Sequence, residues 1–407
     1  MLGSNGCKEA AVPTTAKKEL HAVQKTVKIN SKKTTLNYQS FHAIASDDYG
    51  NIYALGKVAN YKKSALLVKL DSQGKILWER TSNGTFTEMA VDSRGNVYVV
   101  GASWVKTNRN ALIVKYNSSG KRVWKKIFSG SGDENFVNIS VDRNTLYAIG
   151  KTSSSDGDIA KENKGGYDAL IVKLNHNGKK IWMKTFGGRG NEELRGVSVD
   201  KEGDIYVVGK THTYGTDVMY SSAALMLKYD SSGELLWNKT INATPKQSEN
   251  LKDIRALKDI RALKDGFYAL GYLMKQDVVI WVDSKGTLIW KKSVNNSSDN
   301  TFKMITDNQN NIYVTGHNEK YRSMIVKFDS RGNKLWKRSI GNADSSDLFD
   351  VCIGTSNEVY AVGKEVYRRK LPPGAFCGVG EADVGALIVK LSTEGKVLWN
   401  YSIDTDK

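Results

Sequence analysis

Residues 90–101, AVDSRGNVYVVG, and residues 111–124, ALIVKYNSSGKRVW, contain the unit that decides the fold. Each run is rich in Val, Ile and Tyr and is bounded by clusters of Asn, Asp, Ser and Gly, which is the pattern of short strands joined by tight turns. An alternating run at 88–92 precedes them, and Trp124 begins a further run that closes the unit. The unit therefore predicts four antiparallel strands, which we number first to fourth.

The unit occurs seven times, and each copy contains a Tyr three residues before a Gly, followed later by a Trp. The tyrosines are Tyr53, Tyr98, Tyr147, Tyr206, Tyr268, Tyr313 and Tyr360, and the tryptophans are Trp78, Trp124, Trp182, Trp237, Trp290, Trp336 and Trp399. A fixed period of this length marks a repeat architecture, and four-stranded units stacked around a channel form a β-propeller. We therefore predict an all-β fold, a seven-bladed β-propeller with four antiparallel strands per blade. The expected boundaries are a flexible tail at 1–20 and one domain at 21–407, with blades at about 40–81, 86–128, 136–186, 195–241, 253–294, 301–340 and 348–403.

The composition is that of a basic globular protein. Hydrophobic residues make up 40% of the 407 residues and the formal charge is +17, so the chain can bury a core and attracts anionic partners. No basic run carries the interleaved aromatic residues of single-strand binders, so no nucleic-acid partner is expected. One Lys position recurs in six copies, and we interpret it as part of a solvated exterior: Lys69, Lys115, Lys173, Lys228, Lys327 and Lys390.

The three cysteines do not form a disulfide framework or a zinc site, because their spacing is wide and their number is odd. Cys7 follows small residues and precedes a polar linker, which resembles the mature start of a bacterial lipoprotein, although the apolar segment of a secretory signal is absent. Cys7 is either lipidated, as the sole membrane attachment, or an incidental residue of the tail. Cys352 and Cys377 are either bridged or, for Cys352, a buried free thiol.

The turn Gly, the Tyr–Gly pair and the Trp together resemble the bacterial β-propeller repeat known as the SBBP repeat, over residues 40–403. The segments NSSGKRVW and HNGKKIW are more loosely similar to quinoprotein repeats. The first resemblance implies an extracytoplasmic protein, in the periplasm, at the outer membrane or on the cell surface. The second implies either a quinone dehydrogenase or a lipoprotein scaffold of envelope assembly. Seven copies without adjacent cysteines disfavour the dehydrogenase, so no cofactor is expected.

The copies differ most in the interval between the conserved Gly and Trp, which is longest in copies three, four and seven. This extra length lies between the second and third strands, and we expect these loops to share one face with the connections from each fourth strand to the next first strand. Binding sites collect on variable loops held by a rigid frame. The predicted binding residues are Tyr214, Tyr367, Arg368, Arg369 and Phe376.

Two further segments are expected to contribute strands to the ring. Residues 251–256, LKDIRA, are repeated at once as residues 257–262. The later copy precedes an Asp265–Gly266 hairpin signal, so we expect it to form the first strand of blade five, with the earlier copy in the preceding connection. Residues 23–29 resemble a fourth strand and are expected to cover the edge of the last blade.

No arrangement of residues predicts a catalytic or metal site. The five histidines lack partners at metal-ligand spacing. Carboxylates recur near the start of the first strands, and we expect most of them to tie a connection to backbone N–H groups: Glu88, Asp133, Glu134, Glu192, Glu193, Glu249, Asp299 and Asp347. Asp or Asn also stands at the first position of the turns between third and fourth strands. We expect these side chains to accept backbone N–H bonds within the turn rather than to bind calcium.

The sequence therefore favours a monomeric, non-enzymatic propeller outside the cytoplasm that binds a protein or a glycan through its variable loops. Two alternatives stay open. One is an enzyme acting on a carbohydrate-like substrate at the central channel, and the other is an envelope-assembly scaffold lipoprotein.

Overall fold

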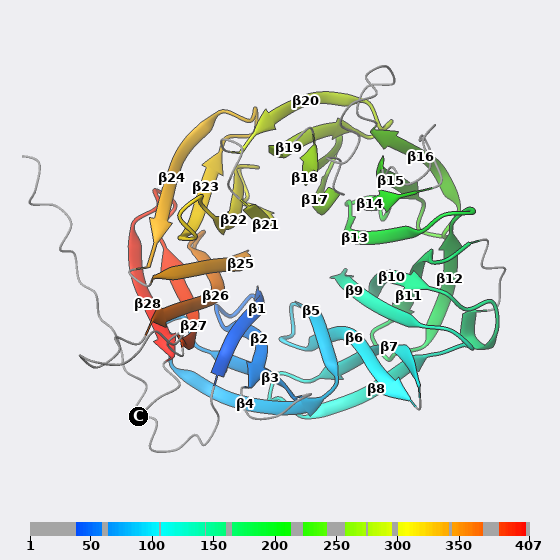
Figure 1. Ribbon diagram of the computed structural model, residues 1–407, viewed down its shortest axis with the longest axis horizontal. Coiled ribbons are helices and arrows are strands. Elements are labelled where there is room, and N and C mark those ends of the chain that lie inside the picture. Colours follow the sequence, from blue (N-terminus) through cyan, green and yellow to red (C-terminus); the bar gives the residue numbers. More distant parts are fainter. Residues whose placement is uncertain are drawn as a thin grey trace, which may run out of the picture.

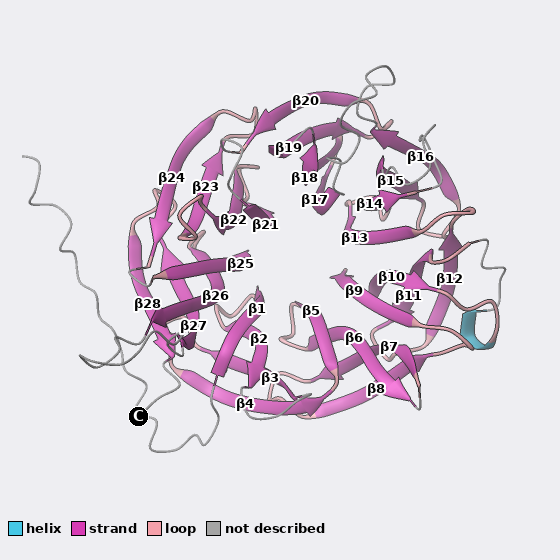
Figure 2. Cartoon of the chain, viewed as in Figure 1, coloured by secondary structure: helices cyan, strands magenta, loops and turns pink. Residues whose placement is uncertain are grey.

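The computed structural model describes residues 38–58, 64–105, 107–142, 144–159, 165–212, 223–241, 257–273, 276–294, 300–341, 344–368 and 382–403. These residues form seven four-stranded antiparallel sheets around one axis (Figure 1). Apart from the short 3₁₀ helix η2 (Gly157–Ile159), their regular structure is β-strand (Figure 2). The prediction of an all-β, seven-bladed propeller is confirmed. No helical segment among the described residues has the length and hydrophobicity of a membrane span.

Each blade uses four consecutive strands, with its first strand nearest the axis (Figure 1). The first strands are β1 (Tyr38–Ser46), β5 (Thr85–Val91), β9 (Glu134–Val141), β13 (Glu192–Val199), β17 (Leu257–Leu263), β21 (Asn300–Thr306) and β25 (Ser345–Ile353). The second strands are β2 (Ile52–Val58), β6 (Val97–Val105), β10 (Thr145–Thr152), β14 (Ile205–Thr211), β18 (Gly266–Leu273), β22 (Ile312–His317) and β26 (Val359–Arg368). The third strands are β3 (Ser64–Leu70), β7 (Asn108–Tyr116), β11 (Asp168–Asn175), β15 (Ala223–Tyr229), β19 (Gln276–Asp283), β23 (Ser323–Phe328) and β27 (Ala382–Leu391). The fourth strands are β4 (Ile76–Asn83), β8 (Arg122–Phe128), β12 (Lys180–Phe186), β16 (Leu235–Ile241), β20 (Leu288–Ser293), β24 (Lys334–Ile340) and β28 (Val397–Ile403).

The ring closes by packing between blade one (β1–β4) and blade seven (β25–β28). Phe41 and Leu66 of blade one share a buried core with Tyr360, Val362 and Ile388 of blade seven. Within the described residues, no strand is exchanged between the two blades, because every sheet contains four strands that are consecutive in the chain. The predicted edge strand at 23–29 lies outside the described residues.

The repeated Tyr and Trp hold neighbouring blades together. In blade two, Tyr98 is buried and its ring centroid lies 6.1 Å from that of Trp124. The Trp124 indole Nε1 donates a hydrogen bond of 3.1 Å to the His176 carbonyl, in the turn between the third and fourth strands of blade three. The same turn presents Gly178 at φ +79°, where an added Cβ would lie 3.1 Å from the Trp124 ring. The turn Gly therefore serves the turn and also lets the preceding blade's Trp approach closely.

The recurring Lys is a second contact between blades, so the prediction of a solvated exterior is wrong. Lys69, Lys115, Lys173, Lys327 and Lys390 are each only 8% exposed. The Lys173 Nζ lies 5.2 Å from the centroid of the Tyr147 ring and donates a hydrogen bond of 2.7 Å to the Ser231 carbonyl in the next blade. A carbonyl and an aromatic face compensate the ammonium for lost water, and its alkyl stem packs as an apolar group.

The tight turns use the predicted chemistry. Asp71 Oδ1 accepts hydrogen bonds of 2.9 Å from the backbone N–H groups of both Gln73 and Lys75, and Gly74 follows at φ +84°. The turns between first and second strands add a link to the core, because Asp47 accepts a hydrogen bond of 2.9 Å from the Tyr53 hydroxyl. These carboxylates therefore stabilise turns, as predicted.

The two ends of the ring carry different connections. The loops between second and third strands and the connections between blades lie at the same end, which we call the loop face. Two backbone bonds show this: the Ser153 N–H donates to the Asp133 carbonyl at 3.0 Å, and the Asp158 N–H donates to the Ser129 carbonyl at 2.8 Å. The tight turns just described lie at the opposite end, which we call the turn face. The predicted sharing of one face is confirmed.

Two smaller predictions are also resolved. The strand β17 begins at Leu257, so the later copy of the duplicated hexapeptide forms the first strand of blade five, as expected. The earlier copy lies outside the described residues. Cys352 is a buried free thiol, and burial, assisted by the nearby charge of Asp350, raises its pKa.

Candidate functional site

The central channel holds two cavities, one toward each face of the ring. The cavity toward the loop face, which we call the vestibule, has a volume of about 530 Å³. It is lined by His42, Thr87, Glu88, Asn135, Val137, Gly150, Lys151, Glu193, Leu194, Arg195, Lys258, Thr301, Phe302 and Lys303. A smaller cavity of about 330 Å³ lies toward the turn face and shares only Glu88 and Lys303 with the vestibule.

A β-bulge in every first strand aims side chains into the vestibule. The ladder to the second strand skips one residue in each blade, at His42, Thr87, Val137, Arg195, Lys258, Phe302 and Phe349. Six of these seven residues line the vestibule. Bulges re-aim side chains and are common beside functional sites. This position holds His, Thr, Val, Arg, Lys and Phe in different blades, so it makes the blades differ from one another in an otherwise repetitive ring.

In four blades the residue after the bulge is charged, and these residues, Glu88, Asp259, Lys303 and Asp350, form a charged belt between the two cavities. Lys303 from blade six forms an ion pair with Glu88 from blade two, across the channel. Asp259 and Asp350 lie near the same ammonium, and although burial alone would lower the pKa of Lys303, these three carboxylates together raise it. The belt therefore braces distant blades with a charged lysine.

The belt carboxylates are also held by backbone donors. Asp350 accepts hydrogen bonds of 2.7 Å from the Ile44 N–H and 2.8 Å from the Val351 N–H. Asp259 accepts a bond of 3.0 Å from the Met304 N–H of the next blade. Burial, with repulsion from Glu88, raises the pKa of Asp350 to about 8. Blade-to-blade bonds in the belt thus depend on a carboxyl group that titrates in the neutral range.

Basic side chains gather on the wall of the vestibule formed by blades three and four. The Glu193 carboxylate accepts ion pairs from Lys151 at 3.0 Å, Lys210 at 3.3 Å and Arg195 at 3.4 Å. Glu193 and Lys210 are directly opposite each other in the β13–β14 ladder, which fixes this arrangement. Burial alone would raise the pKa of Glu193, but the hydrogen bond from Lys151 and the charges of Lys210 and Arg195 outweigh it and lower the pKa.

Aromatic side chains gather on the opposite wall, at blades six and seven. Phe302 packs edge-on against Phe349 and His317, with ring centroids 5.3 Å and 5.7 Å away. Tyr321 lies beside His317 and is 63% exposed. Figure 1 shows β9 and β13 across the channel from β21 and β25, so the basic and aromatic walls face each other.

His42 occupies the bulge of blade one and is neutral. Its Nε2 lies 3.2 Å from the Phe86 carbonyl, and burial, with the charge of Lys57, lowers its pKa to about 4. Among the described residues, no group of three or more His, Cys, Asp or Glu side chains is arranged to hold a metal ion.

The structure describes one predicted binding residue in full. Tyr367 is 37% exposed near the end of β26, and its hydroxyl donates a hydrogen bond of 2.7 Å to Glu365. The backbone of Arg368 pairs with Ala382, but its side chain is not among those described. Tyr214, Arg369, Phe376 and the proposed lipidation residue Cys7 lie outside the described residues.

Among the recurring carboxylates, Glu134 and Glu192 follow the prediction, whereas Glu88, Glu193 and Asp347 form ion pairs instead. Glu249 and Asp299 lie outside the described residues. Glu134 ties its connection through the Gly130 N–H and the hydroxyls of Thr152 and Ser154. Glu192 accepts bonds from the Gly188 N–H and the Thr211 hydroxyl. The prediction is wrong for Glu88, because it lies deeper in β5, next to the bulge, and forms an ion pair with Lys303.

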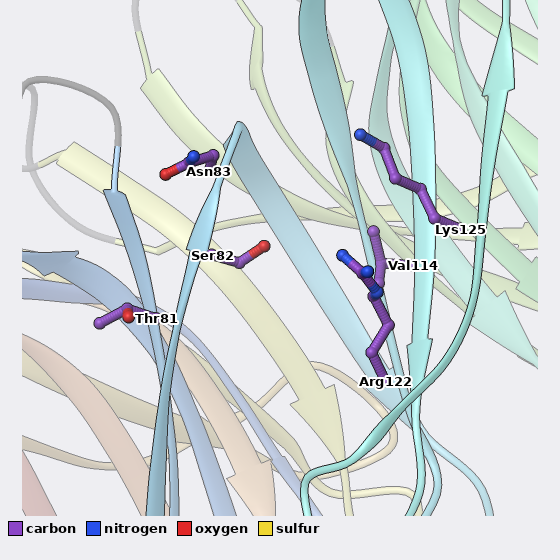
Figure 3. A pocket seen from close by; sticks show the side chains of 6 residues that line it. All are labelled: Thr81, Ser82, Asn83, Val114, Arg122 and Lys125. Atoms are coloured by element: carbon purple, nitrogen blue, oxygen red, sulfur yellow. The ribbon is translucent and has the colours of Figure 1, made fainter.

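Another pocket lies away from the channel, on the outer rim. Its volume is about 370 Å³, and it is lined by Thr81, Ser82 and Asn83 of β4 and by Arg122 and Lys125 of β8, with Ser82 pointing toward the β8 side chains (Figure 3). The pocket carries no aromatic residue and belongs to neither face. The vestibule, where bulge residues from six blades converge, is the better candidate site.

Comparisons with known proteins agree with the fold. The BP39L lectin from Burkholderia pseudomallei is similar with 10% sequence identity and a TM-score of 0.58, over 90% of this chain and 99% of the lectin. The β-propeller domain of the Trilobed protease from Pyrococcus furiosus is similar with 10% identity and a TM-score of 0.52, over 89% of this chain and 98% of that domain. At these identities the likeness concerns the fold alone.

A search of proteins with curated functions finds no significant match. The family model described as outer membrane protein assembly factor BamB matches residues 63–272. This match supports the quinoprotein-like resemblance found in the Gly-Lys and Trp positions of the repeats. Because the matched segment is more than half of the 407 residues, the chain belongs to the family of the outer membrane protein assembly factor BamB.

Proposed function

We propose that the protein is a non-enzymatic binding or scaffold propeller that holds a protein partner at its loop face. The observation that carries this proposal is the coincidence of two irregular features at one end of a regular ring. The long loops between second and third strands lie there, and the vestibule formed by the bulge residues opens there. Variable groups on a rigid frame are the usual composition of a binding site.

The rigidity of the frame supports a recognition role. Neighbouring blades are joined by buried Tyr and Trp rings, by lysines that bond the next blade's turn, and by the belt in the channel. A frame with this many contacts holds the side chains of the loop face in fixed positions before the partner arrives. Pre-organisation of this kind lowers the entropy cost of binding.

Family membership supports a place in the cell envelope. The family is described as an outer membrane assembly factor, so we propose that this protein also acts outside the cytoplasm, as a scaffold in envelope assembly. The proposal includes lipidation of Cys7 and the SBBP-type resemblance, because both fit a protein that acts outside the cytoplasm. Intact mass measured on protein from envelope fractions tests the lipid, because an acylated Cys7 adds a defined mass.

The test of the scaffold role compares the two faces of the ring. The full chain serves as bait in envelope extracts, and captured proteins are quantified by mass spectrometry. Arg195→Glu alters the loop face, and Lys121→Glu makes the same charge change in an exposed turn of the turn face. We expect the principal partner to be lost from the first variant and kept by the second, with equal thermal stability of both. Loss from the turn-face variant alone would overturn the proposal.

A further inference from the structure

We infer that the vestibule binds an acidic peptide segment, with a carboxylate seated among Lys151, Arg195 and Lys210 and an apolar side chain against Phe302. This inference rests on the proposed function and names the chemistry of the partner at the same face. It begins from a cluster of three cations around one carboxylate on one wall of the channel.

Three other cations around the channel mouth, Lys258, Lys303 and Lys364, are matched by carboxylates. Lys258 pairs with Asp277 at 2.8 Å and also donates a hydrogen bond of 2.7 Å to the Thr301 carbonyl. Lys303 is surrounded by the three carboxylates of the belt. Lys364 pairs with Asp347 at 3.1 Å, and Asp347 also pairs with His317. These groups leave no local excess of positive charge.

At blades three and four, cations outnumber carboxylates. Lys151, Lys210 and Arg195 share the single carboxylate of Glu193. Their side chains are 27%, 24% and 47% exposed. Lys151 and Arg195 line the vestibule, and Lys210 joins them through Glu193. Two ammonium groups and one guanidinium carry about eleven N–H donors, whereas one carboxylate offers about four acceptor positions. A second carboxylate from a partner would therefore meet unused donors and an uncompensated positive potential.

The geometry limits the size and the kind of the ligand. A cavity of about 530 Å³ admits a few side chains of an extended segment, but no folded domain. Across the cavity, Phe302 offers an apolar surface that is fixed by Phe349 and His317. The site therefore suits a segment in which an acidic residue stands close to an apolar one.

An anionic glycan fits the lining less well. A sugar needs many uncharged donors and acceptors for its hydroxyl groups, and the vestibule lining contains four uncharged polar side chains, those of His42, Thr87, Asn135 and Thr301. The Thr87 hydroxyl is already bonded to the Val100 and Phe136 carbonyls, at 3.1 Å and 3.0 Å. The observations therefore favour a peptide, and the glycan becomes an outcome of the test.

The experiment measures binding of three labelled probes to the full chain by fluorescence anisotropy. The probes are an octapeptide of alternating Asp and Phe, the same peptide with Lys in place of Asp, and a tetramer of galacturonic acid. We expect the acidic peptide to bind, to weaken with added salt, and to lose affinity about tenfold in Arg195→Glu. Lys121→Glu, the matched control on the turn face, should leave the affinity unchanged.

A second variant should change the peptide affinity in the opposite direction, which a purely structural role of these residues would not produce. Glu193→Gln removes the internal counter-ion while it keeps the shape and an acceptor, so the acidic peptide should bind several-fold more tightly. Unchanged affinity in both Arg195→Glu and Glu193→Gln would overturn the inference, as would binding of the galacturonate probe in place of the peptide. If no peptide binds although the loop face still captures its protein partner, the scaffold role stands and the vestibule inference falls.

Discussion

The turn face and the loop face are built from the same seven repeats, yet they differ in kind. On the turn face, blade after blade places a Gly of positive φ against the preceding blade's aromatic ring and offers a carbonyl to its Trp and Lys. On the loop face, the bulge residue of the first strand varies in type among the blades, and the loops differ in length. The turn face thus repeats the same kind of contact from blade to blade, whereas the loop face varies.

The difference separates stability from recognition. Close-packed contacts tolerate little change, because an added atom must displace a neighbour. Residues that face a cavity or solvent can change without such displacement. We therefore expect large losses of stability from small changes on the turn face, and small losses from changes on the loop face.

The largest effect should come from the contact that closes the ring. In Gly74→Ala, the new Cβ would lie 2.1 Å from the ring of Tyr401 in blade seven, at φ +84°. In Gly50→Ala, the φ is +79° but the nearest atom is 3.5 Å away. We expect a loss of about 3 kcal/mol for the first, from strain and overpacking together, and about 1 kcal/mol for the second, from strain alone. Urea unfolding measures both, and equal losses would show that the closing contact is not tight.

A smaller effect tests the buried lysines. Lys173→Met keeps the apolar stem but removes the ammonium over Tyr147 and the bond to the Ser231 carbonyl. We expect a loss of about 1–2 kcal/mol in the free energy of unfolding. The control is Lys180→Met, at an exposed position of the next strand, which should change stability by less than about 0.5 kcal/mol. Unchanged stability in Lys173→Met would show that the contacts of the buried ammonium contribute no net stability.

The belt in the channel predicts a pH dependence of similar or smaller size. Asp350 has a pKa of about 8 in the folded protein, whereas an unfolded Asp titrates near about 4. Between these values the folded state binds the proton more tightly, so the contribution of Asp350 to stability falls as the pH rises. Asn has no carboxyl proton to lose, so Asp350→Asn removes this contribution to the pH dependence.

We therefore expect the free energy of unfolding to fall by about 1–3 kcal/mol more in the native chain than in Asp350→Asn between pH 5 and pH 8. Thermal unfolding at a series of pH values measures the difference. Asp71→Asn, which changes a turn carboxylate in the same way, is the control. Parallel pH profiles for the native chain and Asp350→Asn would show that Asp350 is ionised throughout this range.

The smallest effect should come from deleting residues 251–256 in a connection of the loop face. The later copy already forms β17 and joins β18 through a tight hairpin. Removing the earlier copy shortens the connection without changing the strand, and loop length has only a weak effect on stability. We expect the melting temperature to stay within about 2 °C, and a loss of folding would show that the earlier copy is needed.

The sequence predicted the strands and the ring well, because the signals are local and occur seven times. Turn residues such as Asp71 and Gly74, and the Tyr and Trp positions, depend on backbone geometry within one blade. The predicted binding residues came from the long loops and do not include the residues of the vestibule. Arg195, Lys258 and Phe302 lie at bulges within first strands, outside those loops. The available signal was the residue after a recurring buried position of the first strand, such as Phe86 or Leu194, because this next residue changes in type from copy to copy.

The sequence by itself determined that this protein is a seven-bladed propeller, because period, turn chemistry and strand pattern are properties of neighbouring residues. Only the tertiary structure decided which side chains meet across the axis and between blades. Lys303 and Glu88 are 215 residues apart and form one ion pair, and Lys173 is buried because the turn of the next blade covers it. Such contacts follow from ring closure and from a bulge that turns two successive residues inward, and neither has a local mark in the chain.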